Sequence, residues 1–93
     1  MSYEIQFTDD ALDDIQALKM AGKLNKIAKL LDEIEEHPYT GSGQIELLKY
    51  ELSGLVSRRI NDFDRLTYKV IEDEQKIVIY RCKDHYANIK FHN

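Results

Sequence analysis

The chain has 93 residues, 43% of them hydrophobic, which is enough for one domain with a single modest core and leaves no room for a second. Its formal net charge of −4 argues against a non-specific nucleic-acid binder, because lysine and arginine drive contact with phosphates. No run reaches the roughly 18 apolar residues of a membrane span and no signal-peptide pattern is present, so we expect a cytoplasmic protein that does not enter a membrane.

The first half of the chain is acidic and predicts a strand that leads into a helix. Residues 1–46 contain four lysines and ten acidic residues, a net charge of −6. The segment YEIQF at 3–7 alternates polar and apolar residues as a short strand does. Thr8 then offers a side-chain acceptor to the start of a helix, and Asp9 and Asp10 place negative charge in its first turn.

Two helices are predicted, separated by AGK at 21–23, and each has one apolar face. The apolar face of the first helix consists of Leu12, Ile15 and Leu18. That of the second consists of Leu24, Ile27, Leu30, Leu31 and Ile34. Pro38 ends the second helix, so the pair forms a helical hairpin.

Beyond the loop YTGSG at 39–43 the apolar period changes to two, and three strands are predicted at 55–61, 65–72 and 76–83. The expected fold class is therefore α+β, with an N-terminal strand, the helical hairpin and an antiparallel sheet of about three further strands. We expect one domain over 1–93. In the last strand, Ile77 and Ile79 compete for the core with Val78, Tyr80 and Cys82.

Strand parity separates the three arginines of VSRRINDFDRLTY, residues 56–68. Val56, Arg58 and Ile60 share one side of their strand, so Arg58 lies with the apolar face or at its margin and has a structural role. If the two strands are joined by an odd number of residues, Arg59 and Arg65 meet on the face away from the helices. The same face is expected to expose Ser57, Thr67 and Lys69.

A basic sheet face of this kind does not by itself indicate a function. Residues 47–93, the second half of the chain, include nine basic and seven acidic residues. Their net charge of +2 allows a local basic patch. The alternative is a solvated surface whose arginines form weak ion pairs with Asp62, Asp64 or Glu72. The residues that flank the arginines favour a functional site.

Four ordered motifs contain or flank these arginines. They are G-x-G-x-x-E-x-L-K at 41–49, L-S-G-x-x-S-R-R-I at 52–60, R-L-x-Y at 65–68 and C-x-x-H-Y at 82–86. In this order they resemble the YoeB/Txe group of the RelE/ParE superfamily, the toxin components of bacterial toxin–antitoxin modules. The resemblance spans nearly the whole chain and implies the RelE-like microbial ribonuclease fold.

The resemblance implies an mRNA interferase, a ribosome-dependent endoribonuclease that uses no metal or other cofactor. The ribose 2′-hydroxyl attacks the adjacent phosphate, which calls for a base, an acid and cations beside the phosphate. The implied catalytic residues are Glu46 as general base, His85 as general acid and Arg65 on the scissile phosphate. The implied substrate-binding residues are Lys49 and Arg59, which hold phosphates, and Tyr86, which stacks on or positions a base.

The resemblance also implies partners and leaves alternatives open. The partners are a YefM/Axe-like antitoxin with a disordered acidic C-terminal segment, the ribosome with its messenger RNA, and a second copy in a homodimer. A ParE-like toxin acting on DNA gyrase is the first alternative, although the glutamate and histidine argue against it. A catalytically silent antitoxin-binding module is the second. Residues 87–93 extend past the last motif, and we expect them either to add an edge strand or to cover the site.

Overall fold

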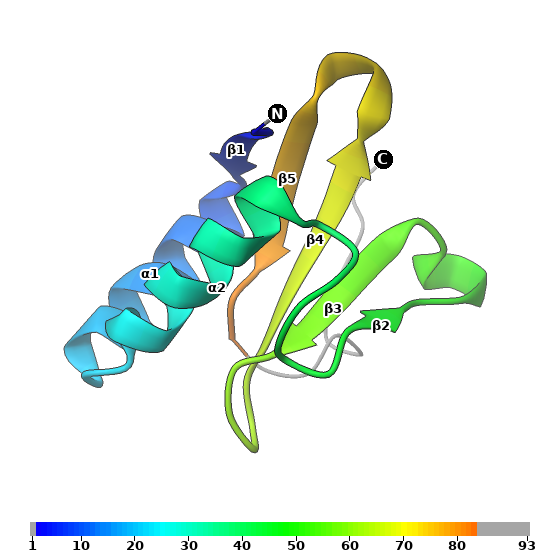
Figure 1. Ribbon diagram of the computed structural model, residues 1–93. Helices are drawn as coiled ribbons and strands as arrows, with labels where there is room; N and C mark the ends of the chain where they lie inside the picture. Colours follow the sequence, from blue (N-terminus) through cyan, green and yellow to red (C-terminus); the bar gives the residue numbers. More distant parts are fainter. Residues whose placement is uncertain (1, 84–93) are drawn as a thin grey trace.

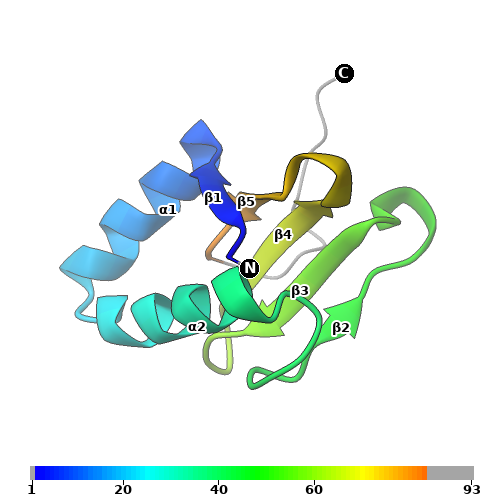
Figure 2. The ribbon, with the colours of Figure 1, turned by 45° about the horizontal axis from the view of Figure 1, so that its top comes forward.

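Two helices pack on one face of a five-stranded sheet in the computed structural model, which describes residues 2–83 (Figure 1). In chain order the elements are β1 (Glu4–Phe7), α1 (Asp9–Met20), α2 (Leu24–Glu36), β2 (Glu46–Leu47), η1 (Tyr50–Leu52), β3 (Leu55–Arg59), β4 (Arg65–Ile71), η2 (Glu72–Glu74) and β5 (Lys76–Arg81). The helices lie side by side, and the sheet curves away from them toward β2 (Figure 2). Within the described residues, no helix is long and apolar enough to cross a membrane.

The strand order in the sheet is β1-β5-β4-β3-β2, which confirms the α+β class and adds two details. Four strands follow the helices rather than about three, because the two residues of β2 pair with β3. The predicted antiparallel pairing of the strands that follow the helices is confirmed, and β1 joins the sheet parallel to β5, so the sheet as a whole is mixed. The helical hairpin carries the chain from β1 across the face of the sheet.

The start of α1 is held as the sequence predicts. The Thr8 hydroxyl accepts a hydrogen bond from the Ala11 amide at 3.1 Å and donates one to the Tyr80 carbonyl at 2.9 Å. One side chain therefore caps the helix and ties its first turn to β5. The predicted break between the helices is also confirmed, with Gly22 at a φ of 75°.

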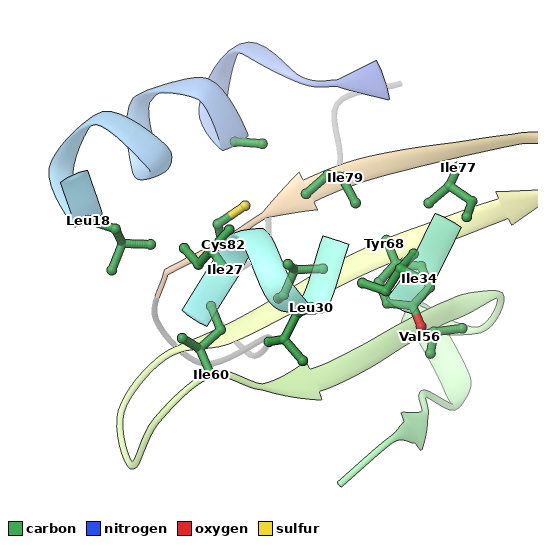
Figure 3. Close-up of a cluster of buried hydrophobic side chains, with 12 residues drawn as sticks. Leu18, Ile27, Leu30, Ile34, Val56, Ile60, Tyr68, Ile77, Ile79 and Cys82 are labelled. Atoms are coloured by element: carbon green, nitrogen blue, oxygen red, sulfur yellow. The ribbon is translucent and has the colours of Figure 1, made fainter. Parts of the chain in front are cut away.

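The apolar face of α2 is confirmed at Ile27, Leu30 and Ile34, and Figure 3 shows Ile27 and Leu30 directed toward the sheet. The prediction for α1 is wrong at one position, because Leu12 is 51% exposed. The buried face of α1 is instead formed by Ala11, Asp14 and Leu18, with Ile15 packed against it. The helix is turned so that a buried carboxylate, not Leu12, faces β5.

A β-bulge resolves the ambiguity of the last strand. Tyr68 pairs with Ile79 but its neighbour Thr67 pairs with Arg81, so Tyr80 is an extra residue on β5. Ile77, Ile79 and Cys82 are all fully buried, although strict alternation would place Cys82 on the other face (Figure 3). Both competing sets therefore contribute to the core.

A buried ion pair joins α1 to the end of β5. The Asp14 carboxylate accepts hydrogen bonds from Arg81 Nε at 2.7 Å and Arg81 Nη2 at 3.0 Å. It also accepts one from the backbone amide of Cys82 at 3.1 Å. One carboxylate therefore accepts from three donors and ties α1 to the end of β5.

Replacing Asp14 by alanine should lower the free energy of unfolding by about 3 kcal/mol, because it breaks the ion pair with Arg81 and removes the acceptor of the buried Cys82 amide. Asp13→Ala is the matched control, since Asp13 is the exposed neighbour and its loss should change stability by less than about 0.5 kcal/mol. Urea denaturation measures both. Equal losses in the two variants would contradict the structural role of the ion pair.

Candidate functional site

The loop between β3 and β4 brings Arg59 and Arg65 together. It consists of residues 60–64, an odd number, as the parity argument requires. The Asn61 side-chain oxygen accepts hydrogen bonds from the amides of Phe63 at 2.8 Å and Asp64 at 2.9 Å, which holds the turn. Arg59 and Arg65 are consequently direct cross-strand partners, and this prediction is confirmed.

Glu46 lies on the same sheet face as these two arginines. It is the cross-strand partner of Ser57 on β3, and Ser57 is in turn the partner of Thr67 on β4. Directly paired residues point to the same side of a sheet, and residues two apart in a strand do as well. Glu46, Arg59 and Arg65 therefore share the face opposite the helices, drawn from three adjacent strands.

Arg65 is held by hydroxyl and carbonyl oxygens. Its Nε donates to the Ser57 hydroxyl at 2.5 Å, and its Nη2 donates to the carbonyl oxygens of Gln44 at 3.1 Å and Ser57 at 3.4 Å. The ion pairs among residues 2–83 do not include Arg65. Its guanidinium is thus oriented by neutral groups and keeps its full positive charge for an anion.

Arg59 is more strongly engaged. It forms an ion pair with Asp62, which the sequence analysis named as a possible partner. It also donates to the Asn61 carbonyl at 3.2 Å and to the Gln44 side chain at 3.3 Å. Its side chain is 39% exposed and that of Asp62 is 81% exposed. An exposed pair of this kind contributes little stability, so a phosphate could replace Asp62 at small cost.

The prediction that Ser57 and Thr67 are exposed on this face is wrong. Both are fully buried, whereas Lys69 is exposed as expected. The Ser57 hydroxyl accepts from Arg65, and among residues 2–83 the Thr67 hydroxyl has no hydrogen-bond partner. The two residues therefore do not form an outer hydroxyl surface.

A hollow of about 420 Å³ lies at the β2 edge of the site. Its walls are Glu46, Leu47, Leu48, Lys49, Tyr50 and Leu52. The hollow brings the predicted base and the predicted phosphate contact, Lys49, to one concave surface, and both side chains are exposed. We refer to this concavity as the β2 hollow.

Arg58 is fully buried on the helix side of the sheet, as its parity predicts. Its Nε donates to the Tyr68 hydroxyl at 3.0 Å, and its Nη atoms donate to three carbonyl oxygens of the loop that follows α2. These belong to His37 at 2.5 Å, Thr40 at 2.8 Å and Ser42 at 3.2 Å. The Tyr68 hydroxyl donates in turn to the Pro38 carbonyl. One arginine thereby shapes the loop that leads to Glu46.

Two glycines of the G-x-G motif allow this loop to approach Arg58. Gly41 has a φ of 117°, and a Cβ there would lie 2.6 Å from a Glu33 carboxylate oxygen and 3.0 Å from Arg58 Nη1. Gly43 has a φ of 98°, and a Cβ there would lie 3.1 Å from the Arg58 Cβ. Both the backbone conformation and the lack of space favour glycine. The motif therefore has a packing role beneath the site.

Sequence reasoning did not identify Gln44 as part of the site. Its backbone carbonyl holds Arg65 and its side chain holds Arg59, so it connects the two arginines. Its φ of 48° places it in the left-handed region, directly after Gly43. The only signal in the sequence was its position within the G-x-G-x-x-E motif.

Glu33 supports the same loop from α2. Its carboxylate accepts hydrogen bonds from the Ser42 amide at 3.1 Å and the Ser42 hydroxyl. These bonds, with a smaller contribution from the charge of Arg58, lower the pKa of Glu33. The loop is thus held on one side by a cation and on the other by an anion.

The remaining predicted residues fall outside this geometry. His85, Tyr86 and the extension 87–93 lie outside the described residues, and their assignments stay predictions. Cys82 is confirmed as a buried cysteine, and burial together with the Asp14 charge raises the pKa of its thiol from 9.0 to about 12. Within residues 2–83, no group of three or more histidine, cysteine, aspartate or glutamate side chains is arranged to hold a metal ion.

Comparison with known proteins gives consistent matches. Residues 7–86 match the family described as the YoeB-like toxin of bacterial type II toxin-antitoxin systems. A toxin YoeB of Mycobacterium bovis is 36% identical over 84 residues, which is 88% of this chain and 96% of that protein. The YoeB/ParE toxin from Agrobacterium tumefaciens superposes with a TM-score of 0.83 at 29% identity, covering 89% of this chain and 99% of the other.

The same comparison finds YoeB from Staphylococcus aureus in two assemblies. The YoeB chain of its dimer superposes on this chain with a TM-score of 0.80. The matching chain of its heterotetrameric YoeB-YefM toxin-antitoxin complex superposes with a TM-score of 0.78. In both, the identity is 35%, and the alignment covers 92% of this chain and 100% of the other. The agreement in sequence and in fold extends over nearly the full length of each protein.

Arg58→Lys should lower the free energy of unfolding by about 3 kcal/mol, because an ammonium cannot reproduce four donor contacts in a buried site. Arg59→Lys makes the same substitution at the next position, where the side chain is partly exposed, and should cost less than about 1 kcal/mol. Urea denaturation of both variants checks the difference. Similar losses would show that Arg58 does not organise the loop.

The Cys82 thiol should resist alkylation in the native protein. At pH 8.5 a thiol with a pKa of about 12 is almost fully protonated, and its burial excludes the reagent as well. Iodoacetamide should therefore label the urea-unfolded chain and leave the folded chain unmodified, as read by mass spectrometry. Rapid labelling of the folded chain would contradict the buried position.

Proposed function

The chain belongs to the family of YoeB-like toxins of bacterial type II toxin-antitoxin systems, and on this premise we propose that it is an endoribonuclease that cleaves messenger RNA on the ribosome. Its working compartment is then the cytoplasm, where translated messages are found. The chemistry proposed for it is attack of a ribose 2′-hydroxyl on the adjacent phosphate.

The way in which Arg65 is held is the observation that supports this proposal. Its guanidinium lies on the same sheet face as Glu46 and is oriented by a hydroxyl and two carbonyl oxygens. A cation that is positioned in advance by neutral groups and has no competing carboxylate among the described ion pairs is suited to bind a phosphate. A glutamate on the same face supplies an acceptor for the 2′-hydroxyl proton.

The proposed reaction divides between these groups. Glu46 takes the proton of the 2′-hydroxyl, whose oxygen then forms a bond to phosphorus. The bond from phosphorus to the 5′ oxygen breaks, and that oxygen takes a proton from His85, leaving a cyclic phosphate on the upstream fragment. Arg65 stabilises the charge that builds on the non-bridging phosphate oxygens. His85 is assigned by its place in the C-x-x-H-Y motif.

Other residues bind the RNA around the cut in this proposal. Arg59 exchanges its ion pair with Asp62 for a phosphate, which costs little because the pair is exposed. Lys49 contacts a second phosphate from the edge of the β2 hollow. Tyr86, assigned from the motif alone, stacks on a base beside the cut.

The partners are proposed from relatives of the chain. YoeB of S. aureus has been seen as a dimer and in a heterotetrameric complex with YefM. We infer that this chain also pairs with itself and with a YefM/Axe-like antitoxin. The net positive charge of residues 47–93 suits an acidic antitoxin segment.

Induction of the protein in bacteria, followed by mapping of RNA ends on translated messages, tests the function. Arg65→Met and His85→Ala should each reduce cleavage at least about a hundredfold, the scale for removing a group that acts on the transition state. Lys29→Met, which removes one positive charge from the exposed surface of α2, is the matched control and should cleave as the wild type does.

Two outcomes would contradict the proposal. Full cleavage by Arg65→Met would remove the proposed phosphate site. Growth arrest with intact messages and altered DNA supercoiling would instead favour a ParE-like action on gyrase.

A further inference from the structure

Tyr50 is held in an unusual position at the rim of the β2 hollow. Its side chain is 92% exposed, so it contributes almost nothing to the core. Its φ is 57°, in the left-handed region that bulky residues seldom adopt. The backbone of Tyr50 takes part in the η1 turn, where its carbonyl accepts from the Ser53 amide, but the exposed ring is not needed for the core. Backbone strain of this kind is concentrated at functional positions.

The β2 hollow combines apolar and charged groups in a way that suits a nucleotide. Leu47, 61% exposed, and Leu48, 6% exposed, give it an apolar wall, and Tyr50 gives it an exposed aromatic ring. Lys49 adds a positive charge and Glu46 an acceptor. Its volume of about 420 Å³ is within the range of small-molecule sites, about 300–1,000 Å³.

We propose that the β2 hollow binds the unpaired base of the nucleotide that carries the attacking 2′-hydroxyl, with that base stacked on Tyr50. The inference rests on the proposed function, because it takes Glu46 as the base that accepts the 2′ proton. Glu46 and Tyr50 both line the hollow, so a ribose placed against Glu46 has its base near Tyr50. Stacking on an exposed aromatic ring is a common way to hold a single-stranded base.

The charges of the hollow favour RNA over a peptide as the occupant. An acidic peptide would meet the Glu46 carboxylate at the wall of the hollow, and like charges brought together in a contact are unfavourable. A nucleotide places its phosphate away from its base, so the phosphate can reach Lys49 while the uncharged base contacts the apolar wall. Both residues of β2 line the hollow, and β2 is the edge strand of the sheet, next to β3 (Figure 1).

Tyr50→Gly tests this inference, because it should lower cleavage without lowering the stability of the protein. Glycine relieves the left-handed backbone, so the melting temperature should stay the same or rise. Cleavage of a translated message should fall about tenfold, the effect of losing one base stack, and the loss should lie in KM rather than in kcat. The preference for particular bases at the cut should weaken as well.

Two further variants make the test specific. Tyr50→Phe keeps the ring and should cleave as the wild type does. Phe63→Ala removes another exposed aromatic, 79% exposed on the loop between β3 and β4, and should also leave cleavage unchanged.

The outcomes separate this inference from the proposed function. If the wild type cleaves but Tyr50→Gly cleaves equally well and at the same sites, the inference is overturned and the function stands. If Tyr50→Gly retains cleavage but loses affinity for an antitoxin, the hollow is a protein-binding surface and the inference is again overturned. A wild type that leaves messages intact overturns both.

Discussion

The buried guanidinium of Arg58 is the interaction on which the site depends. Removing a cation from water is costly, and the cost is offset only when its N–H groups find acceptors. Arg58 finds them in the Tyr68 hydroxyl and three carbonyl oxygens of one loop. That loop continues through Gly43, whose carbonyl accepts from the Arg59 amide, to Gln44, which holds the Arg65 side chain. The contacts of Arg58 on the helix side of the sheet thus position the loop that holds Arg65 on the opposite face.

Adjacent arginines have opposite roles for this reason. Side chains alternate across a strand, so Arg58 enters the core while Arg59 faces outward, opposite Arg65 on β4. The guanidinium of Arg58 is buried and donates to a hydroxyl and three carbonyl oxygens, so it is unavailable to a ligand. The charge of Arg65 is directed by neutral groups and stays available.

The ion pair between Asp14 and Arg81 fixes the opposite end of the sheet. Asp14 holds both the Arg81 side chain and the Cys82 amide, where the chain leaves β5. Figure 3 shows Cys82 among core residues beneath the helices. The site is therefore carried by a sheet whose two flanks are each attached to a helix or its following loop by a buried arginine contact.

The sequence by itself determined the features that depend on local periodicity. The Thr8 cap, the helical hairpin, the inward side of Arg58 and the meeting of Arg59 with Arg65 all follow from spacing along the chain, which is a short-range property. Other features required residues far apart in the chain. Leu12 is exposed because Asp14 turns the helix toward Arg81, 67 positions away. Contacts between distant segments also decide four other features. They are the bulge at Tyr80, the pairing of β2, the burial of Ser57 and Thr67, and the contacts of Gln44 with the two arginines. No local pattern encodes these contacts, so only the tertiary structure decided them.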